Sequence, residues 1–171
     1  MSAQGATCAP PGVDRVDSLA EDLAATVRAA VHTVDDPEYP GLSIVDLGLL
    51  EWCEVTGDGR VSIGLVPTFS GCPALGMIAE DVRVAVSAVP AISNVEVRWL
   101  TSPVWSTDRV SERGRAALAD QFTVAVEIGA GRPTCPRCGN HLSPRSMFGP
   151  SRCRSVSRCT ACSETVEVMR A

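Results

Sequence analysis

The sequence contains no lysine, only two histidines and no long apolar run. Arginine supplies all 15 positive charges, a bias from which we draw no mechanism. No stretch approaches the roughly 20 apolar residues that cross a bilayer, which excludes a membrane-spanning helix. The first residues lack a basic segment followed by an apolar one, so we expect no secretory signal and a cytoplasmic location.

The shortage of histidine limits the chemistry that the chain can perform. A cysteine protease or acyltransferase needs a base beside its nucleophile. His32 ends a predicted helix, where partial positive charge is favoured, and His141 lies in a predicted turn, so neither has a catalytic context. We therefore expect neither of these two activities.

Charge changes sign along the chain. Residues 1–131 carry 8 arginines and 18 acidic residues, a net charge of −10, whereas residues 132–171 carry 7 arginines and 2 glutamates, a net charge of +5. The change predicts a domain boundary near "GAGRP" (129–133). A basic tail can bind nucleic acid or an acidic protein surface, but we favour an ordinary solvated module. Nucleic-acid binding ranks last because Phe148 is its only aromatic residue for stacking on bases.

Hydrophobic periodicity in the first part predicts a small α+β sandwich, in the order α-β-β-α-β-α with helices on one face. The expected helices cover residues 18–34, 72–89 and 111–120, and the clearest strands cover residues 60–68 and 94–100. A hairpin turn is indicated at "GDG" (57–59).

The predicted boundaries follow from capping and composition. Ser18 and Glu21 have the spacing of a capping box, so we expect the first helix to begin at Ser18. The preceding residues have no periodicity and are expected to be disordered. The predicted organisation is a disordered segment (1–17), an α+β domain (18–124), a linker (125–133) and a metal-stabilised module (134–171).

Eight cysteines are the most informative residues present. Without a secretory signal they favour metal binding or reactive thiols over disulfides. Two C-x-x-C pairs predict a tetrahedral site for one structural Zn²⁺ per chain, with iron as the alternative. The predicted ligands are Cys135, Cys138, Cys159 and Cys162, and Cys153 is either an alternative ligand or a free thiol. Gly139 can take the positive φ of such a knuckle, and a module of about 40 residues needs the metal to fold.

The stretch "TFSGCPALG" (68–76) contains a single cysteine before a predicted helix. Pro73 suits the first helical position, which predicts that Cys72 is the N-cap and that the helix dipole lowers its pKa. The alternative is a buried, inert thiol. One thiolate cannot hold a cluster alone, so Cys53, Glu38 or the partner subunit's Cys72 would have to contribute, which makes a homodimer conceivable.

Four stretches together resemble known proteins. "DPEYPGLSIVDLGLL" (36–50) followed by "TFSGCPA" resembles the metal–sulfur cluster assembly domain, a small α+β fold of iron–sulfur maturation proteins. "WSTDRVSERGRAAL" (105–118) and the terminal "CPRCG…SMFGPSRCRSVSRCTAC" narrow the likeness. In this order they resemble the PaaD-type family, accessory proteins of the ring-1,2-phenylacetyl-CoA epoxidase system in bacterial phenylacetate degradation. The likeness covers residues of about 18–168.

The resemblance implies an iron–sulfur or metal-centre maturation factor without independent catalytic activity. Its implied partners are oxygenase or reductase components of the epoxidase or another iron–sulfur client. The alternative is a non-catalytic zinc-ribbon adaptor that docks the oxygenase and reductase components. Cys72, Glu38 and Asp36 are implied as ligands of a transient iron ion or iron–sulfur cluster. The supporting motif positions are Thr68, Ser70, Gly71, Pro73, Trp105, Thr107 and Asp108, together with Pro37 and Asp46. From the residues alone, 36–38 can equally be a plain turn, and Trp105 and Asp108 a packing residue and a cap.

Overall fold

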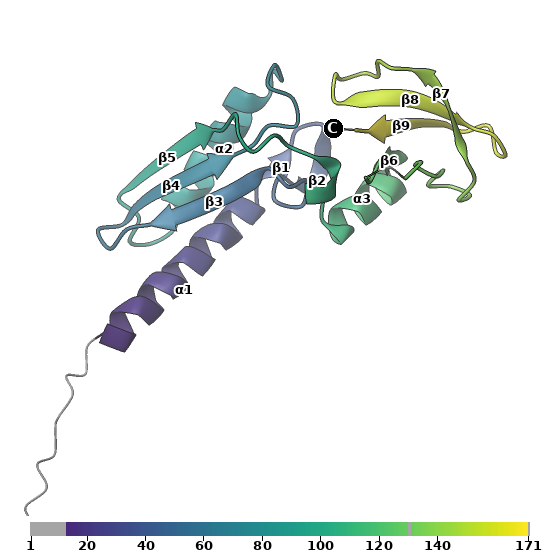
Figure 1. Cartoon of the computed structure of the whole chain (residues 1–171). Coiled ribbons are helices and arrows are strands. Elements are labelled where there is room, and N and C mark those ends of the chain that lie inside the picture. Colours follow the sequence, from purple (N-terminus) through teal and green to yellow (C-terminus); the bar gives the residue numbers. More distant parts are fainter. Residues whose placement is uncertain (1–12, 130, 171) are drawn as a thin grey trace, which may run out of the picture.

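The computed structural model describes residues 13–129 and 131–170 (Figure 1). The helices are α1 (Val13–His32), α2 (Leu75–Ser87) and α3 (Glu112–Phe122), with a 3₁₀ helix η1 (Thr107–Arg109). The strands are β1 (Asp35–Asp36), β2 (Tyr39–Ser43), β3 (Leu50–Val55), β4 (Arg60–Leu65), β5 (Asn94–Trp99), β6 (Val124–Val126), β7 (Leu142–Ser146), β8 (Arg154–Cys159) and β9 (Thr165–Met169). None of the helices in the described ranges is long and apolar enough to cross a membrane.

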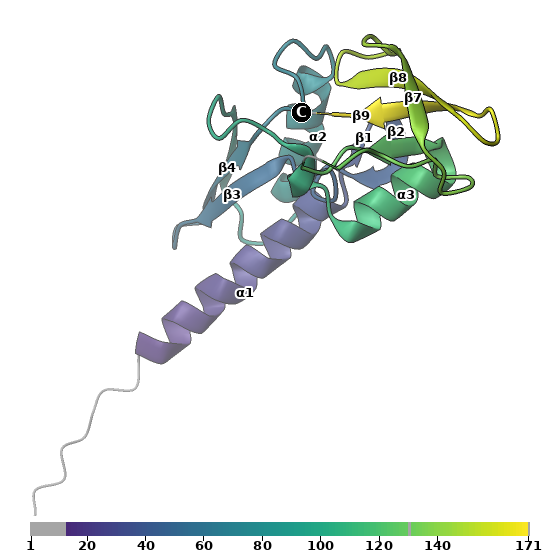
Figure 2. The same cartoon turned by 45° about the vertical axis from the view of Figure 1, so that its right-hand side comes forward.

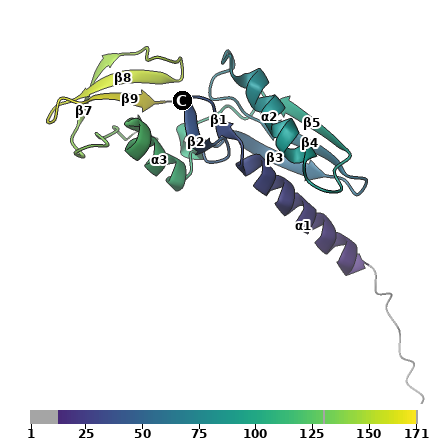
Figure 3. The same ribbon diagram turned by 180° about the vertical axis from the view of Figure 1, so that it is seen from behind.

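A three-stranded sheet, β3-β4-β5, forms the centre of the first part of the chain. β3 and β4 form the predicted antiparallel hairpin, and β5 joins β4 in parallel after the crossover through α2. α1 and α2 lie on the same face of this sheet, as seen from behind in Figure 3. Val61, Ile63 and Leu65 are buried as their alternation predicted, which confirms the α+β fold with helices on one face.

A short hairpin and a tight turn lie beside this sheet. β1 and β2 are antiparallel, with Asp36 opposite Tyr39. The turn that follows contains Gly48 at a φ of 76°, and a Cβ there would lie 2.5 Å from the Arg109 carbonyl oxygen. Glycine is therefore required, both for the backbone conformation and for the close approach of the segment that leads into α3.

The C-terminal part is a four-stranded ribbon in the order β6-β9-β8-β7. It lies beside α3, next to the β1–β2 hairpin (Figures 1 and 2). β6 pairs in parallel with β9, so residues 124–126 are part of the ribbon sheet. The expected linker at 125–133 therefore begins with a strand, because the pairing partner of β6 lies more than forty positions later and left no local signal.

Two helix boundaries differ from the prediction. α1 begins at Val13, so Ser18 lies inside the helix and does not cap it, and residues 13–17 are helical. The remainder of the expected disordered segment, residues 1–12, lies outside the described residues. α2 begins at Leu75 with Ala74 as its N-cap, three residues later than predicted. The N–H of Leu75 donates to the Cys72 carbonyl at 3.4 Å, so a separate turn precedes the helix.

Candidate metal centres

The four cysteines of the C-x-x-C pairs meet at one end of the ribbon. Their sulfur atoms all lie within 4.8 Å of one another. The Sγ atoms of Cys135 and Cys162 are 3.7 Å apart, and those of Cys138 and Cys159 are 3.4 Å apart. Four Zn–S bonds of about 2.3 Å give a tetrahedron with edges of about 3.8 Å. The spacing and the all-sulfur donor set therefore fit one tetrahedral structural metal ion of the zinc type.

Each cysteine pair lies in a hydrogen-bonded turn. The Cys135 N–H donates to the Asn140 carbonyl, and the Gly139 N–H donates to the Cys135 carbonyl, both at 2.8 Å. Gly139 has the predicted positive φ of 72°. Backbone and side-chain N–H groups of Asn140 lower the pKa of Cys138 to about 6. This turn therefore favours the thiolate that a metal needs.

Cys153 is not part of this group. Its backbone precedes β8 on the far side of the ribbon from the paired cysteines, and the four sulfurs already form a complete tetrahedron. The expectation that Cys153 could replace one of them does not agree with the structure. His141 is exposed at a β-bridge with Thr134 and is also outside the group.

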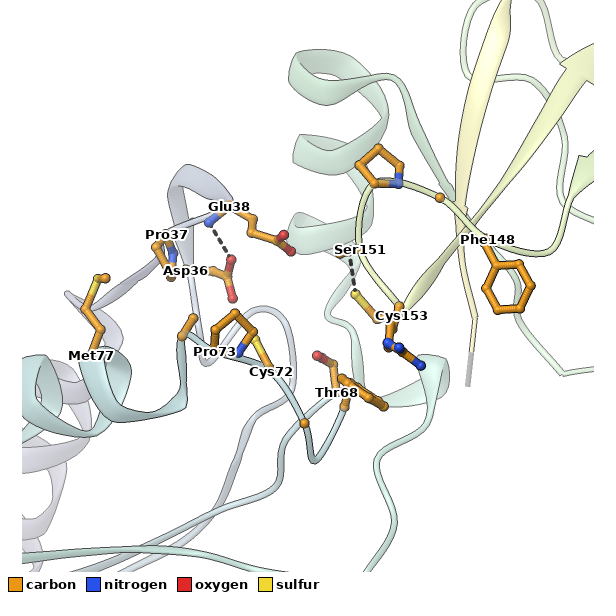
Figure 4. A pocket seen from close by; sticks show the side chains of 16 residues that line it. Asp36, Pro37, Glu38, Thr68, Cys72, Pro73, Met77, Phe148, Ser151 and Cys153 are labelled. Atoms are coloured by element: carbon orange, nitrogen blue, oxygen red, sulfur yellow. Dashed lines mark hydrogen bonds between the residues drawn. The ribbon is translucent and has the colours of Figure 1, made fainter.

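A second candidate centre is a cavity of about 830 Å³ between the first part of the chain and the ribbon (Figure 4). Three segments line it: the Asp36–Glu38 turn, the loop that leads into α2 together with the first turn of that helix, and the loop between β7 and β8. Cys72 and Cys153 both line it, from the second and third segments, together with the carboxylates of Asp36 and Glu38 (Figure 4). Both thiols are free and half-buried.

The Asp36–Glu38 turn is held by its own hydrogen bonds. The Glu38 N–H donates to the Asp36 carboxylate at 2.8 Å, so Asp36 has the capping role of a plain turn. Burial raises the pKa of Asp36. Both residues nevertheless line the cavity, and their carboxylates lie close enough to Cys72 for their charges to raise the pKa of its thiol.

The environment of Cys72 differs from the prediction. The thiol lies before the turn that precedes α2 and is not the N-cap. Burial raises its pKa, a hydrogen bond from the Ala74 backbone N–H lowers it, and the charges of Glu38 and Asp36 raise it further. The pKa of Cys72 is therefore raised, not lowered, and without a metal the group is a neutral thiol at pH 7.

This shift predicts a slow, strongly pH-dependent alkylation of Cys72 in the metal-free cavity. The rate is expected to keep rising beyond about pH 8.5, the ordinary range for a cysteine, because only the thiolate reacts. Glu38→Gln should move the midpoint of the alkylation rate to lower pH, because it removes a negative charge near Cys72. Glu54→Gln, at an exposed position of β3, should leave that midpoint unchanged. Iodoacetamide labelling followed by mass spectrometry measures both. A midpoint below that of the denatured chain would contradict the assignment.

The other motif residues are divided between the cavity and the core. Thr68, Gly71 and Pro73 line the cavity, whereas Ser70 is exposed outside its lining. Trp105 is 3% exposed and its indole N–H donates to the Leu47 carbonyl at 2.9 Å, which is a packing role.

Three further positions are also away from the cavity lining. Thr107 is buried in η1, and Asp108 is exposed beside it. The Asp46 carboxylate accepts a hydrogen bond from the Ser111 hydroxyl at 2.7 Å and lies 3.4 Å from the His32 imidazole. Asp46 therefore connects α1 to the start of α3.

The sequence did not indicate several residues that surround the cavity. Phe69 and Met77 line it from the first part, and Arg152 lines it from the ribbon loop. Cys53, considered as a helper of Cys72, is buried on β3 and lies outside the lining. The sequence does place two arginines, Arg152 and Arg154, on either side of Cys153. Their relation to the cavity can be recognised only from their contacts in the structure.

Two family descriptions match separate parts of the chain. Residues 24–99 match "Iron-sulfur cluster assembly protein", and residues 119–170 match "PaaD zinc beta ribbon domain". A relative from Escherichia coli (strain K12), named as a component of 1,2-phenylacetyl-CoA epoxidase, is 31% identical over 166 residues. The match covers 92% of this chain and 99% of that protein. This chain belongs to the PaaD family.

Shorter relatives resemble one part of the PaaD-type chain. The Fe-S protein maturation auxiliary factor YitW of Bacillus subtilis (strain 168) is 32% identical over 103 residues, which is 60% of this chain and 100% of YitW. A crystal structure of a DUF59 domain from Bacillus anthracis matches with a TM-score of 0.58 and 31% identity, covering 61% of this chain and 99% of that one. Each of these two relatives is long enough to match only one of the two parts of this chain.

Proposed function

We propose that this PaaD-family protein is an iron–sulfur or metal-centre maturation factor for a multicomponent phenylacetyl-CoA epoxidase in aerobic phenylacetate degradation. One observation carries the proposal: Cys72 opens into a cavity that it shares with Asp36 and Glu38. The names of the relatives, a maturation factor and an epoxidase component, agree with that chemistry. The protein acts as an accessory factor and does not turn over substrate itself.

The donors of the cavity suit a cargo that is bound and then released. Soft thiolates bind iron–sulfur clusters, and oxygen ligands such as Asp36 and Glu38 bind iron less firmly. Because Cys72 must lose its proton to bind, occupancy should increase with pH. The raised pKa of Cys72 makes the free thiol unreactive between loading events.

The rim of the cavity suits a protein client. Met77 and Phe148, which line it from opposite sides, are 56% and 76% exposed. We take these two exposed apolar side chains as contacts for a protein client that binds over the cavity. The ribbon, with one structural Zn²⁺ per chain, positions Phe148, so its role is to shape the cavity and the docking surface.

Anaerobic reconstitution with iron and sulfide tests the proposal. Wild type is expected to bind iron and acid-labile sulfide and to absorb in the sulfur-to-iron charge-transfer region. Cys72→Ser should reduce bound iron and bound sulfide at least about tenfold. Loss of a group that only hydrogen-bonds to a metal ligand already lowers metal affinity by about that factor. Cys53→Ala, a cysteine outside the cavity, is the matched control and should retain them.

Two outcomes would remove the proposed role. Equal iron and sulfide in wild type and Cys72→Ser would exclude Cys72 from the site. Cells in which Cys72→Ser fully supports epoxidase assembly, while a ribbon variant does not, would favour the adaptor that docks oxygenase and reductase components.

A further inference from the structure

The ribbon supplies a second thiol to the cavity, and the tetrahedral metal group does not use it. Cys153 is half-buried, and its Sγ lies 3.1 Å from the Ser151 hydroxyl oxygen. Cys72 and Cys153 both line the cavity described above. The two side chains face the same space from different segments (Figure 4).

Both neighbours of Cys153 contact the first part of the chain. The Arg152 guanidinium lies over the Phe69 ring, 5.9 Å from its centroid. Phe69 and Cys72 belong to the same loop before α2. This contact therefore holds the ribbon loop against the segment that carries Cys72.

The residue on the other side of Cys153 makes several contacts. The buried Arg154 pairs with Glu38 at 3.2 Å and with Glu167 at 2.6 Å, and its guanidinium lies 5.1 Å from the centre of the Tyr39 ring. The Gly149 N–H donates to the Arg154 carbonyl at 2.8 Å and closes the loop. Cys153 is thus fixed at both sides and positioned over the cavity.

We propose that Cys153 is a second thiolate ligand of the cargo bound at Cys72, so that one iron–sulfur cluster is held between the assembly domain and the ribbon of a single chain. The proposal rests on the proposed maturation function. It removes the need for the partner subunit's Cys72, because the second sulfur comes from the same chain.

The spacing of the donors indicates the size of the cargo. Within residues 13–129 and 131–170, the ribbon cysteines are the only group of three or more such ligand atoms within 4.8 Å of one another. The donors of the cavity are therefore too widely spaced to surround one ion. A cluster with two or more irons fits better, because Cys72 and Cys153 can bind different irons. Each thiol releases one proton as its Fe–S bond forms, and no electron is transferred.

Reconstitution of the full chain with iron and sulfide separates the two proposals. Cys153→Ser is expected to lower bound iron and sulfide at least about tenfold, as Cys72→Ser does, while one zinc per chain remains. Cys53→Ala removes a buried cysteine that lies outside the cavity, and it should retain the cluster. If Cys153→Ser binds as much cluster as wild type while Cys72→Ser does not, the second ligand is refuted and the maturation function stands. If neither variant changes binding, both fail.

Thiol cross-linking gives a test that does not depend on cluster loading. A short bis-alkylating reagent added to the zinc-loaded protein without iron or sulfide should join Cys72 to Cys153, detected as a linked peptide by mass spectrometry. Arg154→Met, which breaks the contact with Glu38, should reduce the yield. Alkylation of both thiols without linkage in wild type would overturn the proposal, even if the serine variants fail to fold.

Discussion

Replacing Cys159 with serine is expected to unfold the ribbon. The ribbon's own apolar cluster contains only the buried residues Ala125, Cys135, Cys159, Val166 and Val168, with Leu142 packed against them. Two of these, Cys135 and Cys159, belong to the four-cysteine group that fits a zinc-type ion, so a metal bound there would be part of the core. Structural zinc contributes about 10 kcal/mol or more to small modules of this kind, far more than such a cluster can replace.

The expected readout is a fall from one zinc per chain to none and loss of amide protection in β7, β8 and β9. Amide protection should also decrease in the first part of the chain, because Val124 and Met169 of the ribbon belong to the core of that part. Cys153→Ser is the matched control in the same ribbon and should keep both zinc and protection. Retention of zinc and of exchange protection by Cys159→Ser would show that the metal is bound elsewhere.

Replacing Arg154 with methionine is expected to lower the free energy of unfolding by about 3 kcal/mol, the lower end of the range for breaking a buried ion pair. The Arg154 side chain is 10% exposed, and its removal leaves Glu167, 28% exposed, without its cation. Glu38 contributes less because it is 40% exposed and screened by water. Methionine keeps most of the length, so the loss is mainly electrostatic.

Urea unfolding of zinc-loaded protein measures this effect. Arg98→Met on β5 is the control, because both partners of its pair with Glu96 are exposed, at 59% and 51%, so that water screens the pair and its loss should change the free energy of unfolding little. If the two variants lower the free energy of unfolding equally, Arg154 does not join the ribbon to the first part of the chain. A larger loss for Arg154→Met should accompany weaker cluster binding, since the same contact positions Cys153.

The helix ends show where local sequence signals were insufficient. The S-x-x-E spacing at Ser18 and Glu21 predicted a helix start, but the amphipathic pattern extends backward and the helix begins at Val13. Pro73 predicted the first helical position, but the chain first forms a turn closed by Leu75. Pro73 therefore gave the wrong position for Cys72, which is not the N-cap. It also gave the wrong direction for the pKa of Cys72, which is raised and not lowered.

Some features of this protein depend only on residues that are close together in the sequence, and these could be predicted without knowing the fold. A C-x-x-C turn brings its own two sulfurs together, so the zinc-type site followed from Cys135, Cys138, Cys159 and Cys162 alone. Strand alternation and the "GDG" turn defined the β3–β4 hairpin for the same reason, because side-chain direction and turn geometry are local properties of the backbone.

The cavity depended on contacts between distant segments. Cys72, Glu38 and Cys153 come from three separate loops, and no spacing rule relates them. Their positions are set by the pairing of β6 with β9 and by the contacts of Arg152 and Arg154 with the first domain. Packing between distant segments, not proximity in the chain, places Cys153 in the same cavity as Cys72, and this is why the sequence offered Cys153 only as an alternative ligand of the zinc site.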